Sequence, residues 1–202
     1  MKIGILISGR GSNMTAIVEA VQSKQIPSSE VVVVISDKAD AGGLQKAKKK
    51  NVETLVIEKN GRKRAEHDAE IVGELEKRNV ELVCLAGYMR LLSPNFIQAF
   101  PNKILNIHPS LLPSFKGLDA QTQAFEYGVK FSGCTVHFVD ESLDSGAIVA
   151  QKIVDVKDDD TAESLAAQIL EKEHALYIEA IAKIVGGNFK IEGRRVIFNA
   201  LT

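Results

Sequence analysis

The chain has 202 residues, enough for one sizeable hydrophobic core. Charged residues make up 25% of it and the formal net charge is -1, so no overall field favours nucleic acid or an anionic membrane. No apolar run is long enough to span a bilayer, and Met1 leads directly into a β-like run without a signal-peptide pattern. Cys84 and Cys134 lie in apolar strand-like runs, which favours buried thiols over metal ligands. We therefore expect a cytoplasmic protein that binds neither nucleic acid nor membranes.

Short apolar runs alternate with helical spacing through the first half of the chain. The runs are typical of buried strands, and the segments between them place apolar residues three and four positions apart. We expect strands at 2–8, 30–36, 54–57 and 81–86, and helices at 14–21, 41–50, 65–78 and after Ser93-Pro94. This alternation predicts a mostly parallel sheet with helices on its faces. The lysine run at 48–50 is interpreted as a solvated helix face.

A tight glycine turn, Gly9-Arg10-Gly11-Ser12-Asn13, joins the first strand to the first helix. Glycines let backbone N–H groups approach an anion, and a helix start supplies unpaired donors, so a phosphate fits here. Ser12 could instead serve only as the helix N-cap. Met14 stands where a dinucleotide fingerprint needs a third glycine, which weakens a nicotinamide-binding interpretation, although Asp37 could still act as its ribose-binding acid.

The segment Gly87-Tyr88-Met89-Arg90-Leu91-Leu92 follows the fourth strand and is unusually apolar for a loop. It lies at the carboxyl end of an expected strand, where parallel sheets bind their ligands. The segment could line a pocket for a flat heterocycle. Alternatively, Met89, Leu91 and Leu92 could be core residues beneath the loop.

The run Ile104-Leu105-Asn106-Ile107-His108 reads as a further strand, which Pro109 ends. Side chains alternate along a strand, so Asn106 and His108 should share one face at its carboxyl end. Asn106 can donate to a developing oxyanion, and His108 can transfer a proton near neutral pH. Asp144, in the loop after a second apolar run, is the candidate carboxylate partner of His108. On chemistry alone, all three could equally be ordinary turn and capping residues.

The second half of the chain mixes strands, helices and a terminal hairpin. Asp160 and Glu163 are spaced like a capping box, which favours a helix start over a metal site for the acidic run 158–160. His137 is interpreted as a supporting residue beside the site or a satisfied core histidine. The expected elements are a short helix at 119–127, strands at 135–139 and 147–156, a long helix after 161 with an apolar stripe of Leu165, Ile169, Leu176 and Ile184, and a hairpin of 189–191 with 194–198.

The motif Asn106-Ile107-His108-Pro109-Ser110-Leu111-Leu112-Pro113, with the later runs 135–140 and 143–146, closely resembles phosphoribosylglycinamide formyltransferases, the folate-dependent enzymes of purine synthesis. The resemblance extends from Lys2 to about Ile184. It implies that Asn106, His108 and Asp144 form the catalytic trio. Lys116 stands where the family often has proline, and the run 121–123 also departs from the family pattern, which puts the shape of this loop in doubt.

The resemblance also implies which residues contact the ligands. The backbone of Gly11, Ser12 and Asn13 would hold the ribonucleotide phosphate, and Glu173 would bind the ribose. Without the resemblance, Arg64 would be interpreted as surface charge. The residues implied to contact folate are Arg64, Met89, Arg90, Leu91, Leu92, Asn106 and Asp140.

We predict a single α/β domain over residues 1–202, with a mostly parallel, twisted sheet. Residues 1–100 would form a Rossmann-like, phosphate-binding half, and residues 101–202 a more mixed half that carries catalysis and folate binding. The implied reaction transfers the formyl group of 10-formyltetrahydrofolate, the one-carbon donor, to the amine of glycinamide ribonucleotide in de novo purine biosynthesis. We expect no metal, no covalent enzyme intermediate, and a monomer or homodimer.

Three alternatives share parts of this pattern. Methionyl-tRNA formyltransferase carries a similar motif but needs a large further C-terminal domain and a basic RNA-facing surface, and this chain ends soon after the long helix. Formyltetrahydrofolate deformylase normally places a regulatory domain before the glycine loop, which here starts at Gly9. A folate- or nucleotide-binding module with a dead site would bind ligands without turnover, and the retention of all three candidate catalytic residues argues against it.

Overall fold

The computed structural model describes residues 1–199, and they form two compact units. The first unit is Met1–Asn106, and the second begins at Ile107. The predicted single domain with halves meeting at residue 100 stays a prediction. Among the described residues, no helix is both long enough and apolar enough to cross a membrane.

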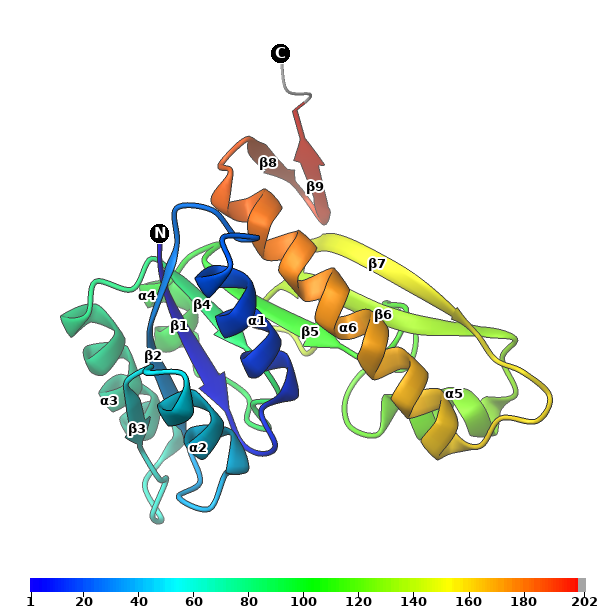
Figure 1. Cartoon of the computed structure of the whole chain (residues 1–202), viewed down its shortest axis with the longest axis horizontal. Helices are drawn as coiled ribbons and strands as arrows, with labels where there is room; N and C mark the ends of the chain where they lie inside the picture. The colour runs from blue at the N-terminus through cyan, green and yellow to red at the C-terminus, as the bar shows by residue number, and fades with distance from the viewer. Residues whose placement is uncertain (200–202) are drawn as a thin grey trace. The chain divides into compact units, whose positions relative to one another are not determined.

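The first unit is a sheet of parallel strands with helices packed on it (Figure 1). The strands follow the order β3-β2-β1-β4-β5, and each neighbouring pair is parallel. The predicted alternation of strands and helices is confirmed, with shifts of a few residues at the ends. The strands are β1 (Lys2–Ile7), β2 (Glu30–Ser36), β3 (Thr54–Val56), β4 (Leu82–Leu85) and β5 (Ile104–His108), and the helices are α1 (Ser12–Gln22), α2 (Gly42–Lys49), α3 (Arg64–Lys77) and α4 (Pro94–Ala99).

Strand β1 lies at the centre of the order β3-β2-β1-β4-β5. Its side chains are apolar on both faces, as a central strand requires. Parallel strands covered by helices on both sides need such continuous apolar runs. Ile71 and Leu75 of α3 are also fully buried. The fully buried side chains of β1 are Ile3, Ile5, Leu6 and Ile7.

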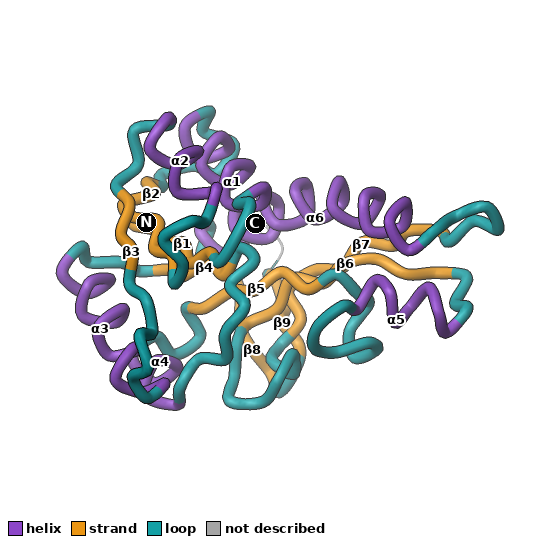
Figure 2. The backbone as a smooth tube through the Cα atoms, turned by 90° about the horizontal axis from the view of Figure 1, so that it is seen from below, coloured by secondary structure: helices purple, strands orange, loops and turns teal. Residues whose placement is uncertain are grey.

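The second unit is built on antiparallel strands. Strand β6 (Phe131–Phe138) pairs antiparallel with β7 (Ile148–Asp155), and the terminal strands β8 (Phe189–Glu192) and β9 (Arg195–Phe198) form the predicted hairpin. Helix α5 (Ala120–Tyr127) is short, whereas α6 (Ala162–Val185) runs along β6 and β7 and packs against both (Figure 2). The predicted apolar stripe of α6 is confirmed as buried: Leu165, Ile169, Leu176 and Ile184. An α/β fold with a mostly parallel first part and a mixed second part is therefore confirmed.

The start of α6 differs from the prediction by one residue. Thr161, not Asp160, is the N-cap: its Oγ1 accepts from the backbone N–H of Ser164 at 3.1 Å, and Ser164 Oγ accepts from the backbone N–H of Thr161 at 2.9 Å. The capping box is thus Thr161 with Ser164, so the predicted pair of Asp160 and Glu163 is wrong. Asp160 instead accepts hydrogen bonds from Ser164 Oγ and Gln168, which lower its pKa.

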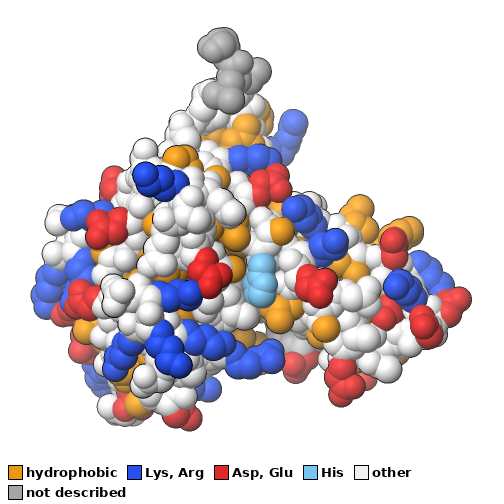
Figure 3. Space-filling view, viewed as in Figure 1, with side chains coloured by type: hydrophobic (Ala, Val, Ile, Leu, Met, Phe, Trp, Pro, Cys, Tyr) orange, Lys and Arg blue, Asp and Glu red, His pale blue; other side chains and the backbone are white. Residues whose placement is uncertain are grey.

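The predicted start of a helix after Ser93-Pro94 and the predicted solvated face of the lysine run are both confirmed. Ser93 caps α4, with its Oγ 3.4 Å from the backbone N–H of Phe96, and Pro94 occupies the first turn. Lys48 and Lys49 are exposed on α2, where Figure 3 shows Lys and Arg side chains gathered on the surface. A solvated face accounts for the lysine run without any ligand.

Candidate active site

Strand β5 carries Asn106 and His108, two residues apart and therefore on the same face. His108 is only 5% exposed, and Asn106 is half-buried. The strand ends at His108 because Pro109 has no N–H to continue a ladder. An amide donor and an imidazole are thus presented together at a strand's carboxyl end.

Asp144 lies in the loop between β6 and β7, and the structure brings it to His108. Its Oδ2 atom is 3.5 Å from His108 Nδ1 and accepts a hydrogen bond from the backbone N–H of Gly117 at 2.9 Å. Both side chains are nearly buried, with exposed fractions of 6% and 9%. The predicted approach of this carboxylate to the imidazole is therefore present. A carboxylate at Nδ1 favours a proton on that nitrogen and so orients the ring.

The loop that carries Asp144 is closed at its base. The backbone N–H of Phe138 donates to the carbonyl oxygen of Ala147 at 2.9 Å. Gly146 lies so close to this turn that a Cβ atom would be 1.8 Å from the Phe138 carbonyl oxygen, so only glycine fits. Asp144 itself has a φ of 47°, a conformation that costs a non-glycine residue free energy.

His137 also contacts the carboxylate of Asp144. Its Nε2 atom is 3.7 Å from Asp144 Oδ1, its Nδ1 atom is 2.8 Å from the carbonyl oxygen of Phe138, and its side chain is 2% exposed. Burial lowers the pKa of His137, which keeps the ring neutral, although the charge of Asp144 acts in the opposite direction. The interpretation of His137 as a supporting residue is consistent with these contacts. Its place near the end of β6, just before the loop of Asp144, is the sequence signal for that role.

A second loop covers the other ring nitrogen of His108. Its Nε2 atom is 2.8 Å from the carbonyl oxygen of Phe115, whose φ is 51°. Lys116 donates a hydrogen bond to Ser145 Oγ, so the two loops are joined at the site. The Phe115 carbonyl oxygen must therefore move away from Nε2 of His108 before a substrate oxygen or nitrogen can form a hydrogen bond to that nitrogen.

Sequence reasoning missed a polar network, buried at Thr135 and Ser110, that fixes the chain after β5. Thr135 Oγ1 donates to the carbonyl of Ser110 at 2.7 Å and accepts from the backbone N–H of Leu112 at 3.0 Å. Gln151 donates to the carbonyl of Leu112 at 3.0 Å and to Thr135 at 2.9 Å. Thr135 of β6 pairs with Gln151 of β7, so both side chains lie on one face of the sheet. Two polar residues at paired positions were the sequence feature that could have predicted this network. The network holds the chain that follows His108.

The glycine turn occupies the start of α1 in the first unit. Gly11, with a φ of 68°, is the N-cap, so the alternative role of Ser12 as the N-cap is wrong. A Cβ on Gly11 would lie 2.7 Å from Gly43 Cα, so the close approach of α2 also requires glycine. Since Gly11 has no side chain to cap the helix, the first-turn N–H groups of α1 can serve an anion.

The loop Gly87–Leu92 is held by backbone contacts while presenting apolar side chains to solvent. Ser8 donates its N–H to the carbonyl of Gly87 at 3.0 Å and accepts from the backbone N–H of Met89 at 2.9 Å. Met89 and Leu91 are 64% and 56% exposed, whereas Leu92 is 9% exposed. The alternative that all three are core residues is therefore wrong for Met89 and Leu91. Two exposed apolar side chains on a tethered loop suit the binding of an apolar ligand face.

Asp68 of α3 is a second anchor for this loop that sequence reasoning missed. It is 1% exposed, and its Oδ2 atom accepts from the backbone N–H of Ser93 at 2.6 Å. Burial, followed by the negative charges of Asp37 and Asp68, raises the pKa of the Tyr88 hydroxyl. Tyr88 Oη, Asp37 Oδ1 and Arg90 Nε are buried without a hydrogen-bond partner in the described part of the chain.

The remaining predicted contact residues occupy distinct places. Arg64 is exposed at the first position of α3, and Asp140 is exposed and accepts from the backbone N–H of Ser142 at 3.0 Å. Glu173 is 6% exposed on the buried stripe of α6. Of the predicted site, the structure brings His108 and Asp144 together, and β5 places Asn106 on the same face as His108.

A buried His–Asp pair beside an amide donor, without a nucleophilic side chain in the pair, is the arrangement of an enzyme that moves a proton and stabilises an oxyanion. The profile of the family described as formyl transferase matches residues 1–181. The chain therefore belongs to the formyl transferase family.

Solved structures and curated proteins agree with this assignment. Glycinamide ribonucleotide transformylase 1 from Symbiobacterium toebii is 49% identical, with a TM-score of 0.96 over 98% of this chain and 93% of that one. Phosphoribosylglycinamide formyltransferase from Anaplasma phagocytophilum is 42% identical, with a TM-score of 0.90 over 99% and 95%. The trifunctional purine biosynthetic protein adenosine-3 of Chironomus tentans is 45% identical over 96% of this chain, which spans 14% of that longer protein.

Proposed function

We propose that this protein is a phosphoribosylglycinamide formyltransferase, which transfers the formyl group of 10-formyltetrahydrofolate to the amine of glycinamide ribonucleotide. The products are formylglycinamide ribonucleotide and tetrahydrofolate, in de novo purine biosynthesis. The buried pair of His108 and Asp144 at the end of β5 carries the proposal, because this pair fits a proton-moving centre. The names of two solved structures that match nearly the full chain support the choice of substrate.

The proposed reaction needs three chemical roles. The amine of the ribonucleotide attacks the formyl carbon, forming a C–N bond and a tetrahedral oxyanion, which Asn106 and His108 stabilise. His108 then helps to protonate the folate nitrogen as the C–N10 bond breaks, and the proton released by the amine balances the one consumed. Asp144 holds the imidazolium that this step requires. No side chain forms a bond to the formyl group, and no step needs a metal.

The proposed ligand contacts are those that the family resemblance implies. Gly11, Ser12 and Asn13 would hold the phosphate, which the uncapped start of α1 supports, and Glu173 would bind the ribose. The proposed folate contacts are Arg64, Met89, Arg90, Leu91, Leu92, Asn106 and Asp140. The exposed Met89 and Leu91, and the buried Nε of Arg90 without a protein partner in the described chain, support this assignment for their loop.

We further propose that the enzyme acts in the cytoplasm as a monomer or homodimer, with no nucleic-acid partner. The balanced charge of the chain supports the last point, since phosphate backbones attract strongly basic surfaces.

A spectrophotometric assay tests the proposed reaction. The protein is mixed with 10-formyltetrahydrofolate, first with glycinamide ribonucleotide and then with water as the only acceptor. Turnover that depends on the ribonucleotide supports the transferase. Turnover in water alone would identify a deformylase, and ligand binding without any turnover would identify a binding module.

A further inference from the structure

The terminal hairpin has no role in the reaction proposed above. Its strands, β8 and β9, follow the residues that match the formyl transferase family, which end at 181. The hairpin side chains are exposed or only half-buried, so they add little to the hydrophobic core. The hairpin nevertheless contacts both strands that carry the loop of Asp144.

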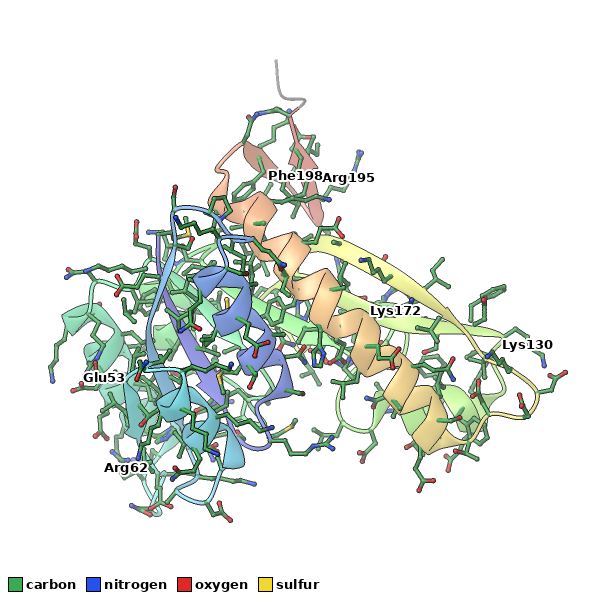
Figure 4. The ribbon with its side chains drawn as sticks, viewed as in Figure 1. Glu53, Arg62, Lys130, Lys172, Arg195 and Phe198 are labelled. Atoms are coloured by element: carbon green, nitrogen blue, oxygen red, sulfur yellow. The ribbon has the colours of Figure 1, made fainter. Side chains whose placement is uncertain are left out.

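The first contact is at the start of that loop. Phe138, the last residue of β6, is 3% exposed, and its ring stacks on Phe189 of β8 with 5.9 Å between centroids and 25° between planes. Phe189 in turn packs on Phe198 of β9, with 6.1 Å between centroids. Figure 4 shows Phe198 and Arg195 on the hairpin, beyond the end of α6. Aromatic pairs at these distances stabilise a contact beyond the effect of their buried area alone.

The second contact is at the end of the loop. Ile148, the first residue of β7, pairs with Arg195 of β9, and its backbone N–H donates to the carbonyl oxygen of Arg194 at 3.3 Å. The hairpin thus contacts both strand ends from which the loop emerges. The backbone hydrogen bond between Phe138 and Ala147 closes the base of this loop. Because the loop is short, a movement of either strand end should also move Asp144.

The hairpin is itself fixed to the end of α6. Lys183 Nζ lies 5.7 Å from the centroid of the Phe198 ring, a cation–π distance. Within the hairpin, Asn199 donates its backbone N–H to the carbonyl of Asn188 at 3.0 Å, and Asn199 Nδ2 donates to Asn188 Oδ1 at 3.0 Å, which joins the open ends of β8 and β9. These contacts make the hairpin a supported clamp on the strand ends.

We propose that the terminal hairpin is a positioning element that holds Asp144 against His108 by clamping both ends of the 139–147 loop. The proposal rests on the proposed function for its catalytic consequence. Asp144 needs such support because its φ of 47° is costly and because its carboxylate must stay near one ring nitrogen. Displacements of about 1 Å at reacting groups can cost roughly 100-fold in rate.

Phe198→Ala tests the clamp because Phe198 backs the Phe189 ring without touching the candidate active site. We expect kcat to fall by about 10-fold or more, with the KM values of both substrates unchanged. Amide hydrogen exchange in residues 139–147 should become faster, while exchange in α1 to α4 stays as in the wild type. Phe198→Tyr keeps the ring and should restore both readouts. Phe131→Ala, at an exposed phenylalanine of β6, is the matched control and should change neither.

Unchanged exchange of the 139–147 loop in Phe198→Ala would overturn the proposal, as would faster exchange spread over the whole second unit. If Phe198→Ala does not fold, Phe198→Leu is measured in the same way. The exchange measurement does not depend on catalysis, so it decides the clamp even if the wild-type protein transfers no formyl group. Failure of the proposed function and failure of the clamp are therefore separable.

Discussion

At the scale of single residues, the environment of Asp144 explains why one carboxylate can support one particular histidine. Its two oxygens face two imidazoles, His108 at 3.5 Å and His137 at 3.7 Å. Burial lowers the pKa of His137, and Nδ1 of that ring lies 2.8 Å from a backbone carbonyl. A neutral His137 does not compete for the negative charge, so the carboxylate of Asp144 remains available to His108.

Replacement of His108 should remove the proposed proton-transfer group and leave the fold intact. We expect His108→Ala to lower kcat by about 10²- to 10⁴-fold, the usual contribution of a general acid or base. Steady-state assays and circular dichroism would measure activity and folding. His174→Ala, at a half-buried histidine of α6 that has no role in the proposed mechanism, is the matched control and should retain most of its activity. A His108→Ala variant with near-normal kcat would remove this residue from the mechanism.

The two cysteines should be unreactive while the protein is folded. Both thiols are buried, and desolvation raises the pKa of Cys134 to about 12, so its thiolate is scarce at neutral pH. We expect slow labelling of both thiols by a disulfide reagent in buffer and rapid labelling of two thiols in denaturant. Fast labelling of the native protein at pH 7.5 would show that a thiol is accessible.

At the scale of secondary-structure elements, the spacing of apolar residues predicted where the helices and strands lie. The exact start of α6 was decided by which of several polar side chains accepts a hydrogen bond from the first-turn N–H groups. The run 158–161 offers several side chains that could cap α6. Thr161 caps the helix because its Oγ1 pairs reciprocally with Ser164, while Asp160 bonds to Ser164 and Gln168 from outside the helix. The residue types in the sequence do not show which of these side chains forms the capping hydrogen bond.

The cap of α6 gives a stability prediction. Thr161→Ala leaves the N–H of Ser164 without its acceptor, so the free energy of unfolding should fall by about 1 kcal/mol. Urea denaturation of the variant and the wild type measures the change. Asp159→Ala, two residues earlier and exposed, is the control and should change stability much less. Equal effects of the two substitutions would contradict the assignment of Thr161 as the cap.

At the scale of the whole molecule, two histidines, one buried and one half-buried, make the free energy of unfolding depend on pH. Burial lowers the pKa values of His137 and His174 in the folded state below their ordinary value of about 6.5. Below that value the unfolded chain binds protons that the folded protein does not, so the free energy of unfolding decreases as pH falls. The stability that these residues contribute is fully present above about pH 6.5 and is lost towards their lower folded pKa values.

Urea denaturation at pH 7.5 and at pH 5.5 should therefore show a lower free energy of unfolding at pH 5.5. His174→Gln removes one of the two groups, so the difference between the two pH values should become smaller in this variant. A wild-type stability that rises on acidification would contradict the shifts of both histidines.

Much of this protein was determined by its sequence alone. The spacing of apolar residues predicted the strands and helices, because the direction in which successive side chains point is set by the local backbone conformation. The order Asn106-Ile107-His108-Pro109 placed an amide and an imidazole on one strand face, because alternation in a strand is equally local. The tertiary structure alone decided that Asp144 reaches Nδ1 of His108, that His137 contacts the same carboxylate, and that Phe115 covers Nε2. The contact of Asp144 with His108 joins residues 36 positions apart, so it depends on how strands and loops pack. The other two contacts join residues seven positions apart through irregular loops, whose shape local spacing does not encode.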